Sequence, residues 1–358
     1  MPVIWLLDAY RAGERGQVRA LAEALCAELD CPLETKALSY RKCVVLPHVL
    51  GQSSLRGLTA AAAAGLRPPW PDLVISCGVR NEPVCRWLRE RSGGRTRYVH
   101  VGRPWGALSS FDLVITTPQY RVPAAPNVLH NTLTLHGITP QRLQRAQSRW
   151  GPAFAGLPRP LTAVLAGGDS GPFTFGPRAA SRLGRQVSRS AAASGGALLV
   201  STSSRTGRAA ATALRAALDA PHYFYQWRAG DDDNPYLGML AWADRVVVTG
   251  DSIAMLSEAC ATGKPVQMFD LGGMRENTRA ARDWRLGATL YAALLRWCWR
   301  PLSRDITLVH RQLRSSGRAV WLDEKPRAAA VPVESALRRS VAAVRALLEQ
   351  GGAGGGVQ

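Results

Sequence analysis

Short apolar runs alternate with helical patterns along most of the chain, and this alternation limits the possible folds more than any other feature of the sequence. Each apolar run is followed by a glycine-rich or polar turn and then by a segment with helical periodicity. Parallel strands need long crossover connections, usually helices, and their sheets are covered on both faces. The pattern therefore predicts an α/β protein built on parallel sheets.

The alternation stops once and then restarts, which divides the chain. In the first part we expect strands at residues 3–7, 72–76, 97–101 and 113–116, and helices at 17–29 and 83–91. Pro152, Pro158 and Pro160 then interrupt the pattern. In the second part we expect strands at 161–166, 197–201, 223–226, 245–249 and 265–269, and helices at 177–194, 206–218, 235–242 and 253–262.

A chain of 358 residues is long enough for two domains, each with its own core. We predict two Rossmann-like domains whose parallel sheets face a cleft, at residues 1–155 and 156–333. An amphipathic helix at 334–350 is expected to cross back over one of them. The glycine-rich tail at 351–358 is expected to be disordered.

The chain is strongly basic, with 45 Lys+Arg against 26 Asp+Glu and a formal net charge of +19. The excess is spread over both predicted domains, with two denser stretches at residues 80–103 and 296–327. Two interpretations stay open: solvated basic faces, or a surface that lies against anionic lipid. A nucleic-acid binder is disfavoured because no recognised binding motif interleaves the arginines and tryptophans.

The cysteines and the hydropathy of the chain suggest where the protein works. The seven cysteines form no CxxC pair and no zinc-like spacing, and their odd number favours reduced thiols. We expect neither a signal peptide at the N-terminus nor an apolar run long enough to span a membrane. These features predict a cytoplasmic protein, with a peripheral position on the inner face of the cytoplasmic membrane as an option.

The loops after two strands of the second domain are suited to an anion. The first, at 166–173, contains Gly168, whose small size lets backbone N–H groups approach a ligand, and Ser170, whose hydroxyl can donate. The second, at 201–207, contains Ser204 and Arg205. The planar guanidinium of Arg205 matches a diphosphate, whereas the serines can alternatively cap the following helix.

The third loop, at 226–236, begins with Gln226 and Trp227 at the end of a predicted strand. It also contains an Asp-x-Asp pair, Asp231 and Asp233, which can hold a divalent cation or simply favour the start of a helix. Asn234 before a proline is typical of an N-cap with proline at the first helical position. The chemistry predicted below needs neither a metal nor a cofactor.

The fourth loop, at 243–266, is the most specific of the four. A strand runs into a small-residue turn, and a helix is expected to begin near Ser252, so its N-terminal N–H groups can hold a phosphate or a sugar ring. Glu258 lies about one and a half turns further along, where a carboxylate can accept hydrogen bonds from a ribose diol. The candidate residues of this loop are Gly250, Asp251, Ser252, Met255, Ser257 and Glu258.

Taken together, these segments resemble glycosyltransferases of the GT-B architecture. The fourth loop is similar to the nucleotide-sugar segment of the bacterial enzyme that adds N-acetylglucosamine to the lipid-linked peptidoglycan precursor. A closer resemblance is to the mitochondrial-fission Elm family, and it covers about residues 3–275. The motifs that carry it are Asp8…Gly13…Gly16-Gln17, Gly167-Gly168-Asp169-Ser170, Ser201-Thr202-Ser203-Ser204-Arg205-Thr206, Asn234-Pro235-Tyr236 and Thr249-Gly250-Asp251-Ser252…Ser257-Glu258.

The resemblance implies roles for these residues. Glu258 would bind the ribose, Ser170 and Arg205 the diphosphate, and the turn at 250–255 the donor sugar or phosphate. Gln226 and Trp227 would lie near the base of a nucleotide, most simply of a UDP-type donor. Arg205 and the helix at Ser252 would stabilise the leaving diphosphate without a metal.

The general base for the acceptor hydroxyl is expected on the first loop of the N-terminal domain. Asp8 and Glu14 are the candidates there, and Gly13, Gly16 and Gln17 complete this acceptor-side loop. The peptidoglycan enzyme has a histidine in its corresponding loop, and this chain has none. Histidines elsewhere in the same domain can instead be structural: His100, His130 and His136.

The sequence therefore predicts a metal-independent glycosyltransferase that moves a sugar from a nucleoside-diphosphate sugar to an envelope or lipid-linked acceptor. Two alternatives stay open: a nucleotide-sugar 2-epimerase with the same architecture, and a non-catalytic membrane adaptor of the fission type. Tryptophans beside arginines, at 284–285, 296–297 and 299–300, suit either a membrane interface or a packed core.

Overall fold

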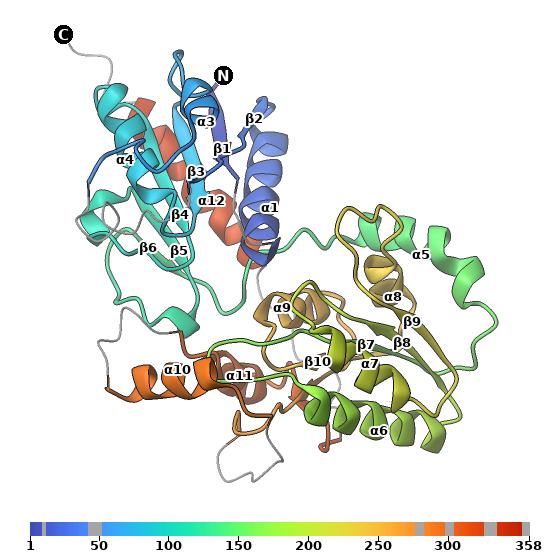
Figure 1. The fold of residues 1–358 in the computed structure, drawn as a ribbon. Coiled ribbons are helices and arrows are strands. Elements are labelled where there is room, and N and C mark those ends of the chain that lie inside the picture. Colours follow the sequence, from blue (N-terminus) through green and yellow to red (C-terminus); the bar gives the residue numbers. More distant parts are fainter. Residues whose placement is uncertain (9–11, 42–51, 276–282, 298–303, 326–334, 353–358) are drawn as a thin grey trace. The chain divides into compact units, whose positions relative to one another are not determined.

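The computed structural model describes residues 1–8, 12–41, 52–275, 283–297, 304–325 and 335–352 (Figure 1). The chain forms two compact units, Met1–Gly137 together with Val333–Gln358, and Ile138–Pro332. Each unit has one parallel six-stranded sheet with helices packed on it. The predicted fold class, α/β with two Rossmann-like parallel sheets, is confirmed, and the cleft expected between the domains stays a prediction.

The first unit has a sheet in the order β2-β1-β3-β4-β5-β6, and every neighbouring pair is parallel. Strands this short and this apolar are typical of a sheet that is buried on both faces. The strands are β1 (Ile4–Leu7), β2 (Leu33–Lys36), β3 (Leu73–Cys77), β4 (Arg97–Val101), β5 (Leu113–Thr116) and β6 (Val128–His130). The helices are α1 (Ala12–Leu29), α3 (Ala60–Ala64), α4 (Glu82–Arg91) and α12 (Ala336–Gly352).

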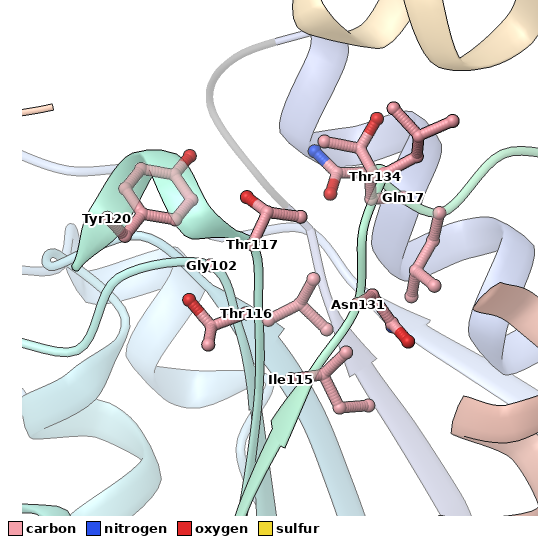
Figure 2. A pocket seen from close by; sticks show the side chains of 11 residues that line it. Gln17, Gly102, Ile115, Thr116, Thr117, Tyr120, Asn131 and Thr134 are labelled. Carbon is pink, nitrogen blue, oxygen red and sulfur yellow. The ribbon is translucent and has the colours of Figure 1, made fainter. Parts of the chain in front are cut away.

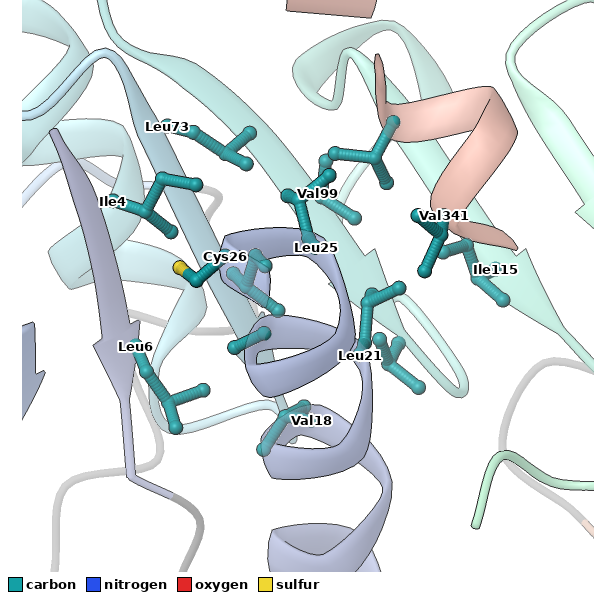
Figure 3. Close-up of a cluster of buried hydrophobic side chains, with 14 of the residues drawn as sticks. Ile4, Leu6, Val18, Leu21, Leu25, Cys26, Leu73, Val99, Ile115 and Val341 are labelled. Carbon is teal, nitrogen blue, oxygen red and sulfur yellow. The ribbon is translucent and has the colours of Figure 1, made fainter. Parts of the chain in front are cut away.

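Alternate residues of these strands build two cores, because successive side chains of a strand point to opposite faces. Ile4 and Leu6 pack with α1 and α12 on one face, as Figure 3 shows, where Leu21 and Val341 lie in the same cluster. Trp5 belongs to the cluster on the other face, which α4 covers. The helix expected at 334–350 therefore packs in the first unit, and residues 353–358 of the expected tail lie outside the described residues.

The second unit has a sheet in the order β12-β11-β10-β7-β8-β9, again with all neighbouring pairs parallel. Its strands are β7 (Leu161–Leu165), β8 (Ala197–Ser201), β9 (His222–Tyr225), β10 (Arg245–Thr249), β11 (Val266–Phe269) and β12 (Val320–Trp321). Its helices are α5 (Pro140–Phe154), α6 (Pro177–Ala193), α7 (Arg208–Ala216), α8 (Tyr236–Trp242), α9 (Ile253–Ala261), α10 (Leu286–Trp297) and α11 (Thr307–Ser315).

The second unit begins before α5, whereas the sequence pattern placed the boundary at residue 155. α5 packs against α8, and the indole N–H of Trp242 donates to the Gln147 carbonyl at 2.8 Å. Gly238 leaves room for this packing, because a Cβ there would lie 2.5 Å from ring atoms of Trp150. The prolines that suggested a linker instead lie in and just after α5, with Pro152 in its last turn.

Candidate functional site

In the sheet of the second unit, the order in which successive strands are added reverses between β7 and β10. β8 and β9 follow on one side of β7, while β10, β11 and β12 follow on the other. The loops that leave β7 and β10 therefore diverge, and ligands of open α/β sheets bind at such a switch point, beyond the carboxyl ends of the strands. We build the candidate site from these two loops and from the loop that follows β8.

Two glycines after β7 allow the three loops to touch. A Cβ on Gly167 would lie 2.3 Å from an Asp251 carboxylate oxygen, and a Cβ on Gly168 would lie 2.1 Å from the Arg205 carbonyl oxygen. The Gly167 N–H donates to the Thr249 hydroxyl at 2.7 Å, and the Gly168 N–H donates to Asp251 Oδ2 at 2.9 Å. Glycine is thus required at both positions by close approach.

An ion pair lies at the centre of this contact. Arg205 Nη2 is 2.7 Å from Asp251 Oδ2; the Asp251 side chain is fully buried, whereas that of Arg205 is 40% exposed. Arg205 Nη1 also donates to the Asp169 carbonyl at 3.0 Å. Among the described residues, Asp251 Oδ1 is buried without a hydrogen-bond partner. The structure therefore brings Gly168, Arg205 and Asp251 together, three residues that the sequence assigned to one site.

Two further arginines hold the same loop, and sequence analysis did not assign them to it. Arg285 Nη2 donates to the Gly171 carbonyl at 3.1 Å, and its Nε is 3.3 Å from the Asp169 carboxylate. Arg304 donates to the hydroxyl of Ser170, which is buried. Three guanidinium groups and two carboxylates thus meet at this loop. Each guanidinium has five N–H donors, so Arg205 and Arg285 keep donors for an anion.

Two of the helices that begin near this edge of the sheet, α6 and α9, have different N-termini. The Asp283 carboxylate accepts hydrogen bonds from the N–H groups of Gly176, Arg178 and Ala179, which caps α6. The N-cap of α9 is Ser252, which makes no side-chain cap hydrogen bond. An uncapped helix N-terminus presents N–H groups and a partial positive charge. Of these two helices, α9 therefore has the N-terminus that is suited to a phosphate or a sugar.

Glu258 on α9 is largely buried and is partnered by a tyrosine. The Tyr236 hydroxyl, at the start of α8, donates to the Glu258 carboxylate. Burial raises the pKa of Glu258 above its usual range, and the hydrogen bond from Tyr236 offsets part of that rise. Burial and the neighbouring carboxylate raise the pKa of Tyr236 well above its ordinary value, so it stays a hydrogen-bond donor at neutral pH.

The remaining residues of the fourth loop have mixed surroundings. Met255 is half-buried, whereas Ser257 is fully buried and its hydroxyl donates to the Ile253 carbonyl at 2.8 Å, so that hydrogen bond lies within α9. The Gly250 carbonyl is 2.6 Å from Nε2 of the buried His310, on α11. Burial lowers the pKa of His310, which favours the neutral ring with Nε2 as the donor.

The candidate residues of the second and third loops are more exposed. Ser204, Gln226 and Trp227 are exposed. The backbone N–H of Trp227 donates to the Thr202 hydroxyl at 2.9 Å. Asn234 accepts from the Tyr236 N–H at 3.0 Å, and Pro235 occupies the N-cap of α8. The predicted cap is therefore shifted by one residue, because the asparagine closes a turn before the helix.

The Asp-x-Asp pair has structural partners. Asp231 accepts from the Tyr225 hydroxyl at 2.8 Å and from the Asp233 N–H at 3.0 Å, and Asp233 forms an ion pair with Arg149. Within the described part of the chain, no group of three or more His, Cys, Asp or Glu side chains is arranged to hold a metal ion. Asp231 acts here as a turn residue.

In the first unit the expected acceptor-side loop is helical. α1 begins at Ala12, so Gly13, Gly16 and Gln17 lie in its first two turns instead of preceding it. The Gln17 amide donates to the Gly13 carbonyl at 3.0 Å, and Gly16 is exposed with open space where a Cβ would lie. Exposed glycines are tolerated in a helix at a modest cost, which explains why the periodicity understated the length of α1.

The two candidate bases lie at the start of this unit. Asp8 follows β1, and its Oδ1 is 2.9 Å from Arg15 Nε. Its backbone carbonyl accepts from the Asn81 amide at 3.3 Å, after the neighbouring strand β3. Glu14 lies in the first turn of α1, where a carboxylate is favoured by the helix dipole. Asp8 is therefore near the carboxyl ends of β1 and β3, and Glu14 lies at the start of the helix that follows β1.

A small pocket lies at the same edge of this sheet, beside α1 (Figure 2). Gln17, Gly102, Thr116 and Asn131 are among its lining residues, and none of the described residues that line it is charged. Thr116 Oγ1 and Asn131 Oδ1 are buried without a hydrogen-bond partner among the described residues. Such a lining suits a neutral polar group, such as a water molecule or a hydroxyl.

The three candidate histidines of the first unit, His100, His130 and His136, are not gathered into one place by any contact in the described structure. His100 is fully buried, 3.1 Å from the Tyr98 hydroxyl, and burial lowers its pKa. Burial also lowers the pKa of His136, while His130 is exposed at the end of β6. Burial and a tyrosine partner favour a structural role for His100.

The basic stretch at 80–103 is partly neutralised by acidic partners. Arg89 and Arg97 both approach the Asp112 carboxylate, at 3.5 and 3.2 Å. Arg86 lies 3.5 Å from Glu82, whose side chain is fully buried. Several arginines of this stretch thus stabilise the first unit, and the stretch is less of a bare basic face than its composition suggests.

Comparisons with known proteins agree with the sequence motifs. The family model described as mitochondrial fission ELM1 matches residues 12–339. The mitochondrial fission protein ELM1 of Arabidopsis thaliana is 29% identical over 237 residues, which cover 60% of this chain and 55% of that protein. The chain thus spans about half the length of that relative. An uncharacterized protein of Rickettsia prowazekii, RP120, is 24% identical over 297 residues, 74% of this chain and 82% of that protein.

Solved structures resemble the chain more distantly. MurG of Acinetobacter baumannii has a TM-score of 0.45 at 12% identity, and the match covers 96% of this chain and 100% of that one. The ADP-heptose lipopolysaccharide heptosyltransferase II of E. coli has a TM-score of 0.45 at 12% identity, covering 97% and 99%. Identities this low at TM-scores below 0.5 do not transfer a function.

Proposed function

The chain belongs to the mitochondrial fission ELM1 family, and within that family we propose that it is a metal-independent glycosyltransferase. It would take a sugar from a nucleoside-diphosphate sugar, most simply a UDP-type donor, and pass it to an envelope or lipid-linked acceptor. The work would take place on the inner face of the cytoplasmic membrane. Asp8 or Glu14 would be the general base for the acceptor hydroxyl.

The observation that carries the proposal is the arginine-held loop after β7. Arg205, Arg285 and Arg304 all contact residues 169–171, at the switch point of the sheet. Three guanidiniums against the carboxylates of Asp169 and Asp251 leave an excess positive charge there. A diphosphate dianion complements that charge, and the uncapped N-terminus of α9 adds N–H donors.

The reaction then follows from where charge develops. The acceptor oxygen forms a bond to the anomeric carbon as the bond from that carbon to the diphosphate oxygen breaks, and the base takes the acceptor proton. The departing nucleoside diphosphate gains negative charge, which the guanidiniums and the α9 dipole stabilise. Glu258 is proposed to hold the ribose, with Tyr236 orienting its carboxylate.

A thermal-shift panel of UDP-, GDP- and ADP-sugars tests donor binding. We expect one class to raise the melting temperature, and Arg205→Ala to weaken its affinity roughly tenfold or more, because a charge-assisted contact is lost. Arg208→Ala removes an exposed arginine three residues away and is the matched control. The proposal fails if no nucleotide sugar shifts the wild-type protein, or if both variants bind as it does.

Family membership favours a second candidate, a non-catalytic membrane adaptor, because the Arabidopsis relative bears the name of a fission protein. A complementation assay separates the two: an enzyme needs Glu258, so Glu258→Ala fails to complement, whereas an adaptor tolerates the change. Product analysis without acceptor identifies the remaining alternative, since a 2-epimerase converts the donor alone.

A further inference from the structure

α10 has two faces of different character. Six large hydrophobic side chains are exposed in the described structure, and three of them lie within seven residues of one another here: Trp284 is 77%, Leu286 60% and Leu290 63% exposed. Leu286 and Leu290 are one turn apart on the same face of the helix. The helix is the orange element of the second unit in Figure 1.

The opposite face of α10 is attached to the loop after β7, residues 166–173, which we call the donor loop. Ala288 is buried, and the Tyr291 ring lies where a Cβ on Gly171 would be only 3.0 Å away. The Tyr291 hydroxyl accepts from the Arg304 N–H at 2.9 Å, and Arg285, just before the helix, donates to the Gly171 carbonyl. The helix is thus fixed from within, and its apolar outer face is left to solvent.

The charge of the whole chain selects the partner, because the chain carries a net charge of +19. Two copies with this charge repel each other, and three side chains are far fewer than the 20–30 residues that each partner contributes to a stable protein interface. An anionic bilayer attracts the charge and accepts shallow apolar groups, with tryptophan favoured at its interface.

We propose that the outer face of α10, with Leu286 and Leu290, docks on an anionic lipid bilayer together with Trp284, which lies just before the helix. This deepens the proposed function, since it names the element that would bring the donor loop to a membrane. Because Arg285 and Tyr291 contact that loop, docking would also hold the arginine cluster close to the lipid surface, where a lipid-linked acceptor is presented.

Vesicle co-sedimentation of the full chain tests the docking face. We compare phosphatidylcholine vesicles with vesicles that also contain phosphatidylglycerol, in the absence of nucleotide. The double variant Leu286→Ser/Leu290→Ser removes the apolar stripe, and Trp105→Ser removes a 39% exposed tryptophan of the first unit as the matched control. All these residues are exposed, and equal unfolding midpoints verify that the variants fold.

We expect the wild type to bind the anionic vesicles at least about tenfold more tightly than the neutral ones. The double variant should bind them roughly tenfold or more weakly than the wild type, with the control unchanged. Brominated lipid should quench wild-type fluorescence, and Trp284→Phe should lose most of that quenching. The proposal is overturned if the wild type does not bind, if the double variant binds equally well, or if the wild type is a dimer that the double variant dissociates. The vesicle assay contains no nucleotide, and the thermal-shift panel contains no lipid. The docking proposal and the donor-binding proposal can therefore fail independently of each other.

Discussion

Each unit contains a fully buried carboxylate beside an arginine, and the two are satisfied differently. In the first unit, Glu82 accepts from the backbone N–H groups of Trp105 and Gly106, at 2.8 and 2.9 Å, one on each oxygen. In the second unit, Asp251 Oδ2 accepts a hydrogen bond from the Gly168 N–H and forms an ion pair with Arg205. Its Oδ1 has no hydrogen-bond partner among the described residues.

The difference separates a structural anchor from a candidate ligand site. Backbone N–H groups cannot leave Glu82 without moving the loop that contains Trp105, so this carboxylate fixes that loop. Arg205 is a half-exposed side chain and can share its remaining donors with an incoming anion. Burial of a charge is therefore a weaker indicator of function here than the exposure of its partner.

Removing the anchor should have the largest effect. Glu82→Ala leaves the Trp105 and Gly106 N–H groups without their acceptor and Arg86 without its ion-pair partner, and we expect the first unit to lose about 3–5 kcal/mol of stability. Denaturant unfolding measures the loss, and Glu90→Ala, at an exposed position of the same helix, is the control. The fraction of the Glu82→Ala variant that stays folded should bind the nucleotide sugar as tightly as the wild type does. A loss below about 1 kcal/mol would show that Glu82 is not an anchor.

Gly168→Ala should have the next largest effect. It changes the surroundings of Asp251, the buried carboxylate of the second unit. The added Cβ would meet the Arg205 carbonyl oxygen at 2.1 Å, and backbone cannot move aside cheaply. We expect a stability loss of about 1–3 kcal/mol together with loss of the nucleotide-dependent thermal shift. Gly156→Ala, which has open space around it, should change neither. An unchanged thermal shift for Gly168→Ala would place the ligand elsewhere.

Glu258 tests an intermediate case, a buried carboxylate with a tyrosine partner, and its effect should be smallest. Because burial raises its pKa, the folded state retains a proton that the unfolded state releases above about pH 4.5. Stability should therefore fall as the pH rises from 4.5 through the raised pKa.

Glu258→Gln should flatten this profile, measured by denaturant unfolding across a pH series. Tyr236→Phe should steepen it, because the hydrogen bond that offsets the rise is lost. If the free energy of unfolding varies with pH in the same way for the wild type and Glu258→Gln, then Glu258 is not the source of the pH dependence.

Much of the fold follows from local pattern. Strands such as β4, β5, β8 and β10 begin and end where the apolar runs do. The missed strands β2, β6 and β12 are short, and two of them clearly lack that signal: β2 is a half-exposed edge strand of sequence Leu-Glu-Thr-Lys, and β12 has two residues. The domain boundary was misplaced because prolines at a helix end look like prolines in a linker.

The site was only partly predictable for a different reason. Gly168, Arg205 and Asp251 each follow a strand, so their neighbourhood at the sheet edge follows from topology. Arg285 and Arg304 reach the loop across 114 and 134 residues of sequence, and nothing local distinguishes them from the chain's other arginines. The role of Asp283, which caps α6 from over 100 residues away, could not be predicted for the same reason.

The position of α12 has a consequence for how the protein is made. Its Val341 and Val344 complete the core formed with α1, and Ser340 hydrogen-bonds to Asn131. All of residues 138–332 lie between these partners, so the ribosome releases an entire second unit before the first can close. Until then the part of this face that α12 covers stays open. A chain that lacks α12 therefore keeps part of an apolar face open to chaperones and proteases.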